Sequence, residues 1–459
     1  MTGDRKAQRI WHRDPRTAIA LLRAKAGGDG LDAEDMSLLS WLMLTEERDL
    51  DGAERYARMA LAGDSGDLRF AFSALAELLL RRGEYEEGVH VLQRANARRP
   101  NRWYELTIAD ALIEAGRSGE AEQLLEAALA DDELNRHALK RLAQLALASG
   151  DRDETIRRFN DLIAIAPNYL VYASDYVTLA RLQLDAGERE AARETLRKGA
   201  EIYARNADIA ELREGEFGES VEAAPRVQQI AEQQSGTQRI PVRTPLISGR
   251  TGLLPLLDDA TRDLRRPGDV IALAESPAAG GQGRLVPLEL IEPGIAAKVL
   301  CQFVGKIGPL HSPEGMQGAI VECGLPRVLV GAVAGAFGKL IGRRGWFYRV
   351  TGPQAAMIDD VAACIPPFDH HMVYGPRDPD GLAGELADAL GCPVAIVDAN
   401  HKTGAWAVGA SAGVDRGWVE ASLADNPAGN EDEQTPVVIL RRAEAEPSQR
   451  EAPTSSSLA

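Results

Sequence analysis

A glycine that recurs at nearly constant spacing constrains the fold of this chain more than any other feature. An alanine stands seven residues before each of these glycines, and a large apolar residue stands nine residues after it. The glycines lie at intervals of 33, 34 and 37 residues and are Gly83, Gly116, Gly150 and Gly187. The alanines are Ala76, Ala109, Ala143 and Ala180, and the large apolar residues are Leu92, Leu125, Phe159 and Leu196. A small residue lets two helices approach closely, and a glycine turns the chain between them. The period predicts stacked helix pairs.

The spacing resembles that of the tetratricopeptide repeat, whose helix-turn-helix unit has about 34 residues. Prolines close two of the units, at Pro100 and Pro167. A weaker unit precedes them, with Trp41, Ala53 and Ala60 in the matching places. Asp14-Pro15 would begin a still earlier helix, with the aspartate as cap. We therefore expect an all-α solenoid domain over residues 1–213.

Solenoids of this kind expose an extended concave surface. The resemblance implies a protein or peptide partner on that surface. The alternative is that the array dimerises the protein or braces the second half of the chain.

Composition bounds the remaining possibilities. A chain of 459 residues predicts two or three domains, and 45% hydrophobic with 26% charged residues is typical of a soluble globular protein. The net charge of −17 argues against a nucleic-acid partner, which favours a basic face.

The four cysteines are 22, 41 and 28 residues apart, so they predict neither a zinc ribbon nor a redox pair: Cys301, Cys323, Cys364, Cys392. The start of the chain lacks the apolar stretch of a signal peptide. The apolar region from Val328 to Ile341 is too short and too rich in glycine to span a bilayer as a helix. We expect a cytoplasmic protein with no membrane partner.

Two segments read as lacking a core. Residues 214–242 are rich in Glu, Gln, Gly and Ser and predict a flexible linker, with one short helix near Val227 to Gln233. Residues 443–459 have nothing to bury and predict a disordered tail.

The second half reads as a mixed α+β domain over residues 243–442. Apolar runs bounded by turn residues predict strands at Asp269–Ala274, Gly318–Val321, Arg327–Val333, Trp346–Val350, Met372–Tyr374, Pro393–Val397, Ala405–Gly409 and Val437–Leu440. Helical patterns cover Gly252–Arg265, Asp380–Leu390 and Val419–Ala424. The strands do not alternate with long helices, so a doubly wound sheet is not favoured.

Three local features invite a site on their own. Gly331 to Leu340 resembles a phosphate loop but lacks the required glycine at Val333 and the hydroxyl at Leu340, so close packing is the simpler interpretation. Asp398 follows an apolar strand, where metal ligands collect, although such a residue is more often a cap. His370 and His371 are adjacent, so on a strand they would point to opposite faces and not chelate one ion.

Several stretches, taken in order, resemble the ligase that adds γ-linked glutamate to the deazaflavin coenzyme F-420. They are Thr244-Pro-Leu-Ile247, Gly268 to Ser276, Gly281-Gln-Gly-Arg-Leu-Val286, Asp398 after its apolar run, and Gly429-Asn-Glu-Asp-Glu-Gln-Thr-Pro436. The resemblance covers residues 244–441 and implies a ligase that forms an amide bond through an acyl phosphate. It implies GTP or ATP as co-substrate, Mg²⁺ or Mn²⁺, a small-molecule carboxylate and an amino acid as substrates, and a homodimer.

The family's functional positions fall on this chain as follows. Its nucleotide contacts fall on Thr244, Pro245, Leu246, Ile247, Glu275, Ser276, Gly429, Asn430, Glu431, Asp432 and Glu433. Its metal ligands fall on Asp359, Asp398 and Asn430.

The chain departs from the family where phosphate and metal would bind. A lysine of the family is replaced by Gly280, and a hydroxyl residue after the metal aspartate is replaced by Ala399. Lys339 or Lys402 would be the replacement charge. The sequence therefore favours a nucleotide- and metal-dependent amino-acid ligase of the γ-glutamyl type, targeted by its repeat array. The alternative is a non-catalytic scaffold whose ligase-like domain is a degenerate binding or dimerisation module.

Overall fold

The computed structural model describes residues 6–63, 65–204, 206–219, 236–249, 251–304, 309–343, 345–358, 365–400, 404–429 and 433–442. Residue contacts divide the chain into two compact units. The first comprises Met1–Ala224, Leu246–Leu256 and Glu275–Arg377, and the second comprises Pro225–Pro245, Leu257–Ala274 and Asp378–Ala459. The division differs from the expected domains, 1–213 and 243–442, because a stretch of about a hundred residues of the second half packs with the repeat helices.

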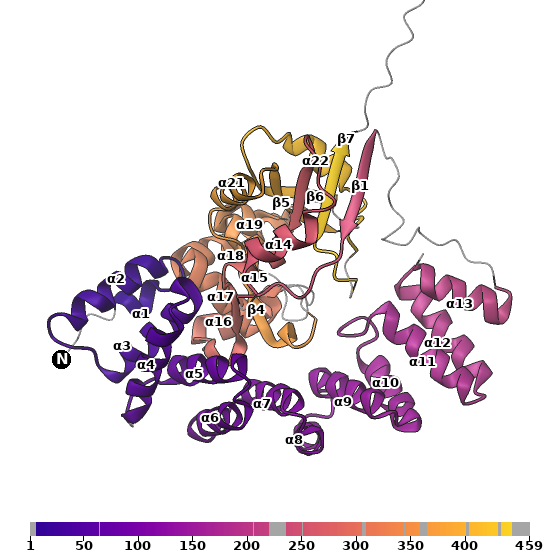
Figure 1. Ribbon diagram of the computed structural model, residues 1–459, viewed down its shortest axis with the longest axis horizontal. Helices are drawn as coiled ribbons and strands as arrows, with labels where there is room; N and C mark the ends of the chain where they lie inside the picture. Colours follow the sequence, from indigo (N-terminus) through magenta and orange to yellow (C-terminus); the bar gives the residue numbers. More distant parts are fainter. Residues whose placement is uncertain are drawn as a thin grey trace, which may run out of the picture. The chain divides into compact units, whose positions relative to one another are not determined.

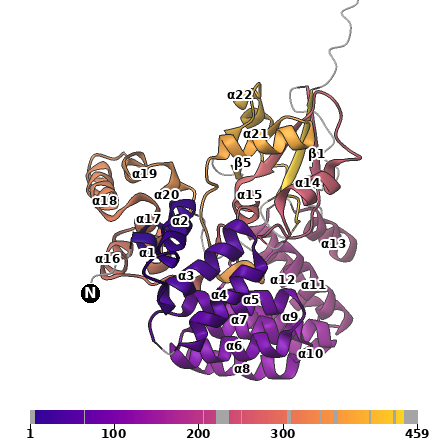
Figure 2. The same cartoon turned by 60° about the vertical axis from the view of Figure 1, so that its left-hand side comes forward.

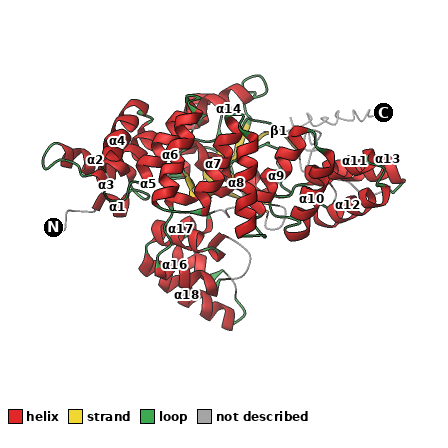
Figure 3. Ribbon diagram, turned by 90° about the horizontal axis from the view of Figure 1, so that it is seen from below, coloured by secondary structure: helices red, strands yellow, loops and turns green. Residues whose placement is uncertain are grey.

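The repeat array runs along the first unit (Figures 1 and 3). Its helices are α1 (Lys6–Ile10), α2 (Pro15–Ala26), α3 (Ala33–Leu42), α4 (Leu50–Ala62), α5 (Arg69–Arg81), α6 (Tyr85–Arg98), α7 (Arg102–Glu114), α8 (Ser118–Asp131), α9 (Arg136–Ser149), α10 (Arg152–Ile165), α11 (Ala173–Asp185), α12 (Arg189–Ile202) and α13 (Ala207–Phe217), with a π-helical turn at Met43–Glu47 after α3. Asp14 caps α2 by accepting from the amide of Thr17, as expected from Asp14-Pro15.

The repeat pattern is confirmed residue by residue. All four recurring glycines have positive φ, between 73° and 81°, in the turn between two helices. The alanines before them and the large residues after them are at most 2% exposed. Small residues therefore set the distance between the helices, and the large residues fill the grooves between neighbouring units.

The first unit continues with short elements from the second half of the chain. They are α15 (Glu275–Gly281), β3 (Leu285–Pro287), the 3-10 turns Leu288–Leu290, Cys301–Phe303, Pro309–His311 and Phe368–His370, α16 (Ile295–Leu300), α17 (Pro313–Cys323), α18 (Leu325–Leu340), α19 (Trp346–Thr351), α20 (Pro353–Ala356) and β4 (His371–Val373). β3 and β4 pair antiparallel. Val286, Leu288 and Met372 belong to the same apolar core as the array helices α3 to α8.

Three of the predicted strands are wrong. Gly318–Val321 lies in α17, Arg327–Val333 in α18, and Trp346–Val350 in α19. Short apolar runs of this length suit a packed helix as well as a buried strand, and pattern alone does not separate them.

The glycine run from Gly331 to Leu340 is helical and packs closely, so the phosphate loop is ruled out in favour of the simpler interpretation. A Cβ on Gly338 would lie 2.6 Å from the carbonyl oxygen of Arg343 and 3.1 Å from Trp346. A Cβ on Gly335 would lie 3.2 Å from Phe347. The glycines therefore let α18 lie against α19 and the turn before it.

The second unit holds a mixed sheet, ordered β1-β7-β2-β5-β6 among the described residues. Its strands are β1 (Thr237–Val242), β2 (Val270–Ala274), β5 (Val394–Asn400), β6 (Gly404–Ala410) and β7 (Val437–Arg442); only β2 and β5 are parallel. Helices α21 (Pro379–Leu390) and α22 (Arg416–Ser422) pack on it; Figure 2 shows α21 against β5. α14 (Leu253–Thr261) contributes residues to both units.

The strands predicted here are confirmed, but β1 was missed because it falls in the expected linker. Its alternating residues pair with β7 from Thr237 opposite Arg442 to Val242 opposite Val437. Polar residues such as Gln238 and Arg239 are typical of a solvent-exposed linker. In the structure Arg239 is buried and pairs with Asp425. The expected short helix near Val227 to Gln233 and the tail from 443 lie outside the described residues.

No single helix in the described part of the chain is long and apolar enough to cross a membrane.

Ala143→Trp is expected to destabilise the protein by about 1–3 kcal/mol, because overpacking a close helix contact forces side chains and backbone apart. Ala143 is completely buried on α9. Ala148→Trp is the matched control, since Ala148 is an exposed alanine of the same helix. Chemical denaturation measures both, and equal midpoints would show that Ala143 is not at a helix contact.

Candidate functional site

Two of the sequence-predicted nucleotide stretches lie side by side in the second unit. The amide of Thr244 donates to the carbonyl oxygen of Gln434 at 2.9 Å, and the hydroxyl of Thr435 donates to the carbonyl of Ala428. Thr244 is buried, Pro245 is exposed, and Gly429 turns the chain with a φ of 78°. The structure therefore joins the start and the end of the predicted nucleotide set in this unit. Asn430, Glu431 and Asp432 lie outside the described residues.

The sequence predicted that Asp398 lies at the end of a strand, and the structure places it elsewhere. It lies within β5, opposite Trp406 of β6, and its side chain is exposed, although partial desolvation raises the pKa of its carboxyl. Asp359, the other expected aspartate ligand, lies outside the described residues, as does Asn430. Among the residues that the structure describes, no three His, Cys, Asp or Glu side chains are grouped to hold a metal ion.

The remaining predicted nucleotide residues lie in the first unit. Glu275 and Ser276 begin α15, and Leu246 with Ile247 forms a loop against that helix. A Cβ on Gly280 would lie 2.9 Å from the carbonyl oxygen of Ile247 and 3.2 Å from Leu285. A lysine side chain, which the resembled family has at this position, therefore does not fit here. The close packing of Gly280 against Ile247 and Leu285 requires a glycine.

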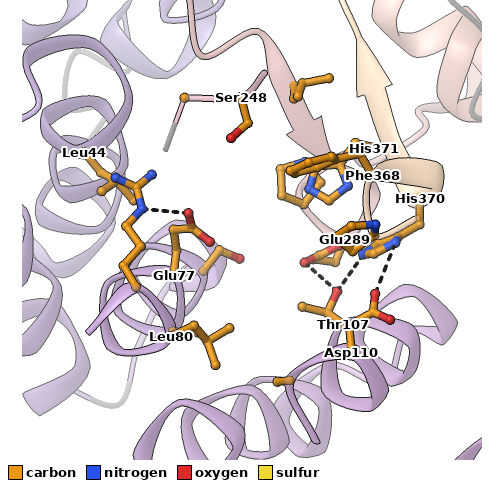
Figure 4. Close-up of a pocket in the computed structure, with 18 of the residues that line it drawn as sticks. Leu44, Glu77, Leu80, Thr107, Asp110, Ser248, Glu289, Phe368, His370 and His371 are labelled. Atoms are coloured by element: carbon orange, nitrogen blue, oxygen red, sulfur yellow. Dashed lines mark hydrogen bonds and ion pairs between the residues drawn. The ribbon is translucent and has the colours of Figure 1, made fainter. Parts of the chain in front are cut away.

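A different pocket lies within the first unit, between array helices α3, α5 and α7 and the segments 248–249, 283–289 and 367–371 (Figure 4). It holds about 120 Å³, somewhat less than a cavity of roughly 150 Å³ that binds benzene. Glu289, Thr107 and His370 lie on one wall, and Glu77 lies on the opposite wall. No sequence pattern predicted this pocket, because its lining comes from seven separate stretches of the chain.

A buried arginine holds the wall of this pocket in place. Arg141 of α9 donates to both oxygens of Asp110 on α7, each at 2.7 Å. It also donates to both oxygens of Asp369, each at 2.9 Å. Arg141 and Asp369 are almost wholly inaccessible to solvent. One guanidinium thus joins two array helices to the turn Phe368–His370, using the planar fork that only arginine has.

His137 completes the surroundings of Asp369. Its Nδ1 lies 2.7 Å from Asp369 Oδ2. Burial lowers the pKa of His137, so the ring is neutral and donates from Nδ1. Burial alone would raise the pKa of Asp369, but the Arg141 charge and the hydrogen bonds from His137 and Arg141 hold it well below its usual range. The carboxylate is therefore ionised and fully partnered.

Glu289 is a pocket residue with an unused polar atom. It is 5% exposed, and no described group hydrogen-bonds to its Oε2. Thr107 Oγ1 lies 3.2 Å from Glu289 Oε1, 3.1 Å from His370 Nε2 and 3.1 Å from the carbonyl of Trp103. Burial raises the pKa of Glu289. The Thr107 hydroxyl is placed to donate to Glu289 Oε1 and to the carbonyl oxygen of Trp103, and its one proton serves one of these acceptors at a time.

The pocket carries more acid than base. Glu77, Asp110, Glu114 and Glu289 line it in the described part of the chain, together with Arg81. Glu77 pairs with Arg81 at 2.8 Å, and Asp110 is neutralised by Arg141. Glu114 is exposed at the edge and Glu289 is buried inside. The acceptor that remains inside the pocket is Oε2 of Glu289, which suits a ligand that brings hydrogen-bond donors.

Comparisons with known proteins concern the array. A tetratricopeptide-repeat family model matches residues 112–174, which run from the end of α7 to the start of α11. Similar solved structures include a tetratricopeptide-repeat protein from Parabacteroides merdae (21% identity, 46% of this chain and 82% of that one, TM-score 0.34). YrrB, described as a repeat protein with an unusual peptide-binding site, is 16% identical, and the match covers 42% of this chain and 98% of YrrB (TM-score 0.33). The type IV pilus biogenesis factor PilW is 17% identical, and the match covers 44% of this chain and 93% of PilW (TM-score 0.34).

No curated protein matches this chain. The family match and the helix pairs of the structure together make the first half a tetratricopeptide-repeat array.

Arg141→Met is expected to cost about 3–5 kcal/mol of folding free energy, because it removes the arginine from the buried carboxylate of Asp369 and from the part-buried carboxylate of Asp110. The matched control is Arg157→Met on α10, where the exposed Arg157 pairs with Glu154, and the expected loss is about 0–1 kcal/mol. Urea denaturation measures both. Equal losses would show that Arg141 is not buried between the carboxylates.

The contribution of His137 to stability is expected to fall as the pH is lowered from about 7 to about 5. In the folded state the pKa of His137 is lowered, so the unfolded chain binds more protons below its ordinary pKa of about 6.5. Asp369, whose pKa is also depressed, adds to the loss only below about pH 4.

His137→Gln should make the dependence of unfolding free energy on pH shallower in that range, since glutamine does not titrate. His90→Gln, at an exposed histidine of α6, is the control and should leave the slope unchanged. The same slope in His137→Gln and in the wild type would contradict the assignment.

Proposed function

We propose that the repeat array acts as a peptide-binding scaffold whose bound peptides are two segments of its own chain, residues 282–292 and 367–377. The contact that supports this most is the Arg141–Asp369 pair, which is buried and uses both carboxylate oxygens. Other array residues contact the same segments: Glu46 pairs with Arg377 at 2.7 Å, and Arg69 pairs with Glu292 at 3.1 Å. This is the bracing role that the sequence analysis set beside an external partner.

The consequence of this scaffold is the pocket beside Glu289, and we propose that it receives a small amine. An ammonium group would meet the unpartnered Oε2 of Glu289 and lie among further carboxylates of the lining. Charge-assisted hydrogen bonds of this kind are stronger than neutral ones, particularly where water is excluded. The acidic lining disfavours a dicarboxylate such as glutamate.

The proposal predicts a selective and proton-linked response. Small primary amines should raise the melting temperature of the protein, whereas alcohols and carboxylates of the same size should not. Burial raises the pKa of Glu289 in the empty pocket, and an ammonium group bound beside the carboxyl would lower that pKa, so binding should be linked to proton release. Calorimetry in buffers of different ionisation enthalpy measures that release.

Glu289→Gln should weaken amine binding by about tenfold or more and abolish the proton release, because an amide has no charge to offer. Glu292→Gln is the control, since Glu292 is an exposed glutamate that pairs with arginines outside the pocket. Binding that is equal in Glu289→Gln and the wild type would place the amine elsewhere. A wild type that binds no amine would contradict the proposal.

The ligase suggested by the sequence is the second candidate. It would be a nucleotide- and divalent-metal-dependent amino-acid ligase of the γ-glutamyl type, using GTP or ATP. The adjacency of Thr244 and Gln434 within the second unit favours it, and the closed space at Gly280 weighs against it. An amine is also the nucleophile that an amide-forming ligase consumes, so the two proposals are chemically compatible. Asp398, an exposed carboxylate, is a suitable oxygen donor for Mg²⁺ or Mn²⁺.

Titration calorimetry with GTP and with ATP, each with Mg²⁺ and with Mn²⁺, tests the ligase directly. We expect binding that requires the metal and is lost in Asp398→Asn, because the amide keeps the shape and removes the charge. Asp388→Asn, a carboxylate of the neighbouring helix α21, is the control. Wild-type protein that binds neither nucleotide would leave the non-catalytic scaffold as the function of this chain.

A further inference from the structure

Helix α18 presents its bulky apolar side chains outward. Its small residues, Gly331, Gly335 and Gly338, face α19, and Val328 on the same side is completely buried. Bulky apolar residues exposed by 37 to 84% recur at helical spacing: Leu325, Leu329, Val330, Val333, Leu340 and Ile341. Phe337 is 54% exposed and also packs against Trp346 of α19, with ring centroids 6.0 Å apart. In a water-soluble helix the bulky apolar face is normally the buried one. Here the arrangement is reversed.

The exposed face extends beyond the helix. Lys339 Nζ donates to the carbonyl oxygen of Phe303 at 3.5 Å, which brings the end of α18 next to the turn Cys301–Phe303. Phe303 is itself 73% exposed. Figure 3 shows α16, α17 and α18 grouped together within the first unit. Contiguous apolar exposure of this kind marks an interaction surface.

The sequence of α18 and α19 carries basic residues and no acidic ones. From Cys323 to Ile358 the sequence has no Asp or Glu and has five basic residues, Arg327, Lys339, Arg343, Arg344 and Arg349, whereas the whole chain has a net charge of −17. Arg327, Lys339, Arg343 and Arg349 are exposed. A local excess of positive charge in an acidic protein directs this face toward an anionic surface.

We propose that this face docks on an anionic lipid bilayer, with α18 lying in the interface rather than crossing it. Its 16 residues span about 24 Å, shorter than the roughly 30 Å of a hydrocarbon core. α17 and α18 have the length and apolar composition of a membrane span only when taken together, and they are bent by 116°. Exposed aliphatic side chains flanked by Lys and Arg are the composition of helices that lie at the membrane surface.

The sequence predicted no membrane partner because residues 328–341 are too short and too rich in glycine to cross a bilayer as a helix. A protein partner is less favoured by the composition, because the centres of protein interfaces are poor in lysine and rich in tyrosine and tryptophan. In α18 the outward side chains are mainly aliphatic, and its last turn carries Lys339. A bilayer accepts such a surface without a complementary shape.

Flotation of the full chain with vesicles tests the proposal. We expect the protein to float with vesicles of phosphatidylcholine and phosphatidylglycerol and much less with phosphatidylcholine alone. Val333→Glu and Leu340→Glu should each weaken this binding by about tenfold or more, since each places a charge in the buried face of the interfacial helix. Arg343→Glu should weaken it through the electrostatic contribution, and more so at low salt.

Leu134→Glu is the control, because Leu134 is 67% exposed in the turn before α9 and far along the chain from α18. It should float as the wild type does. Three results would overturn the proposal: no flotation with anionic vesicles, equal flotation of Leu340→Glu and the wild type, or equal losses in Leu340→Glu and Leu134→Glu. Self-association that Leu340→Glu abolishes, without vesicle binding, would show instead that the face joins two copies of the chain.

Discussion

The ion pair between Arg141 and Asp369 is the interaction on which the first unit depends. Both side chains are removed from water, which is costly for either charge alone. The cost is offset because the guanidinium reaches two carboxylates at once and every oxygen of Asp369 is hydrogen-bonded. Beside it, Lys140 pairs with Asp175 of α11 at 2.6 Å, so α9 is linked to the array helices on both sides. The surface of the repeat array around α7 and α9 therefore binds the turn Phe368–His370 of the same chain.

That commitment changes what the array can do. An array with a free concave surface offers it to outside peptides, whereas here helices α5, α7 and α9 already contact Leu288–Leu290 and Phe368–His370. The segments complete a core with the array, through Val286, Leu288 and Met372, and they leave a small polar pocket beside it. The array therefore contributes walls to a binding site, and the chemistry of that site is set by Glu289 and its neighbours.

The sequence predicted the array well because its information is local and periodic. Each glycine, alanine and large residue has the same surroundings in every unit, so one rule covers Gly83 to Leu196. The pocket has no such rule. Arg141 and Asp110 look like ordinary surface charges of helices, and His370 was judged by the alternation of a strand, whereas it lies in a 3-10 turn. One sequence signal pointed to this buried ion pair. Two basic residues, Lys140 and Arg141, stand among the apolar residues of α9.

The errors in the second half have a similar origin. In α17, α18 and α19, apolar runs were read as strands because length and composition do not distinguish a packed helix from a strand. The α18 glycines were expected to pack, and they do, but only the structure shows that the bulky side of the helix is then left outside. β2 was predicted, yet its neighbours in the sheet, β5 and β7, follow more than a hundred residues later, and no local pattern reveals that pairing.

Hydrogen exchange of the intact protein tests the central claim most directly. If the array holds its own segments, the amides that pair β3 with β4, together with Tyr374, whose amide bonds to the carbonyl of Arg284 at 3.1 Å, should exchange as slowly as those of α5 and α7. Exchange of the 285–287 and 371–374 amides at the rate of solvent-exposed loops, while α5 and α7 remain protected, would contradict the account.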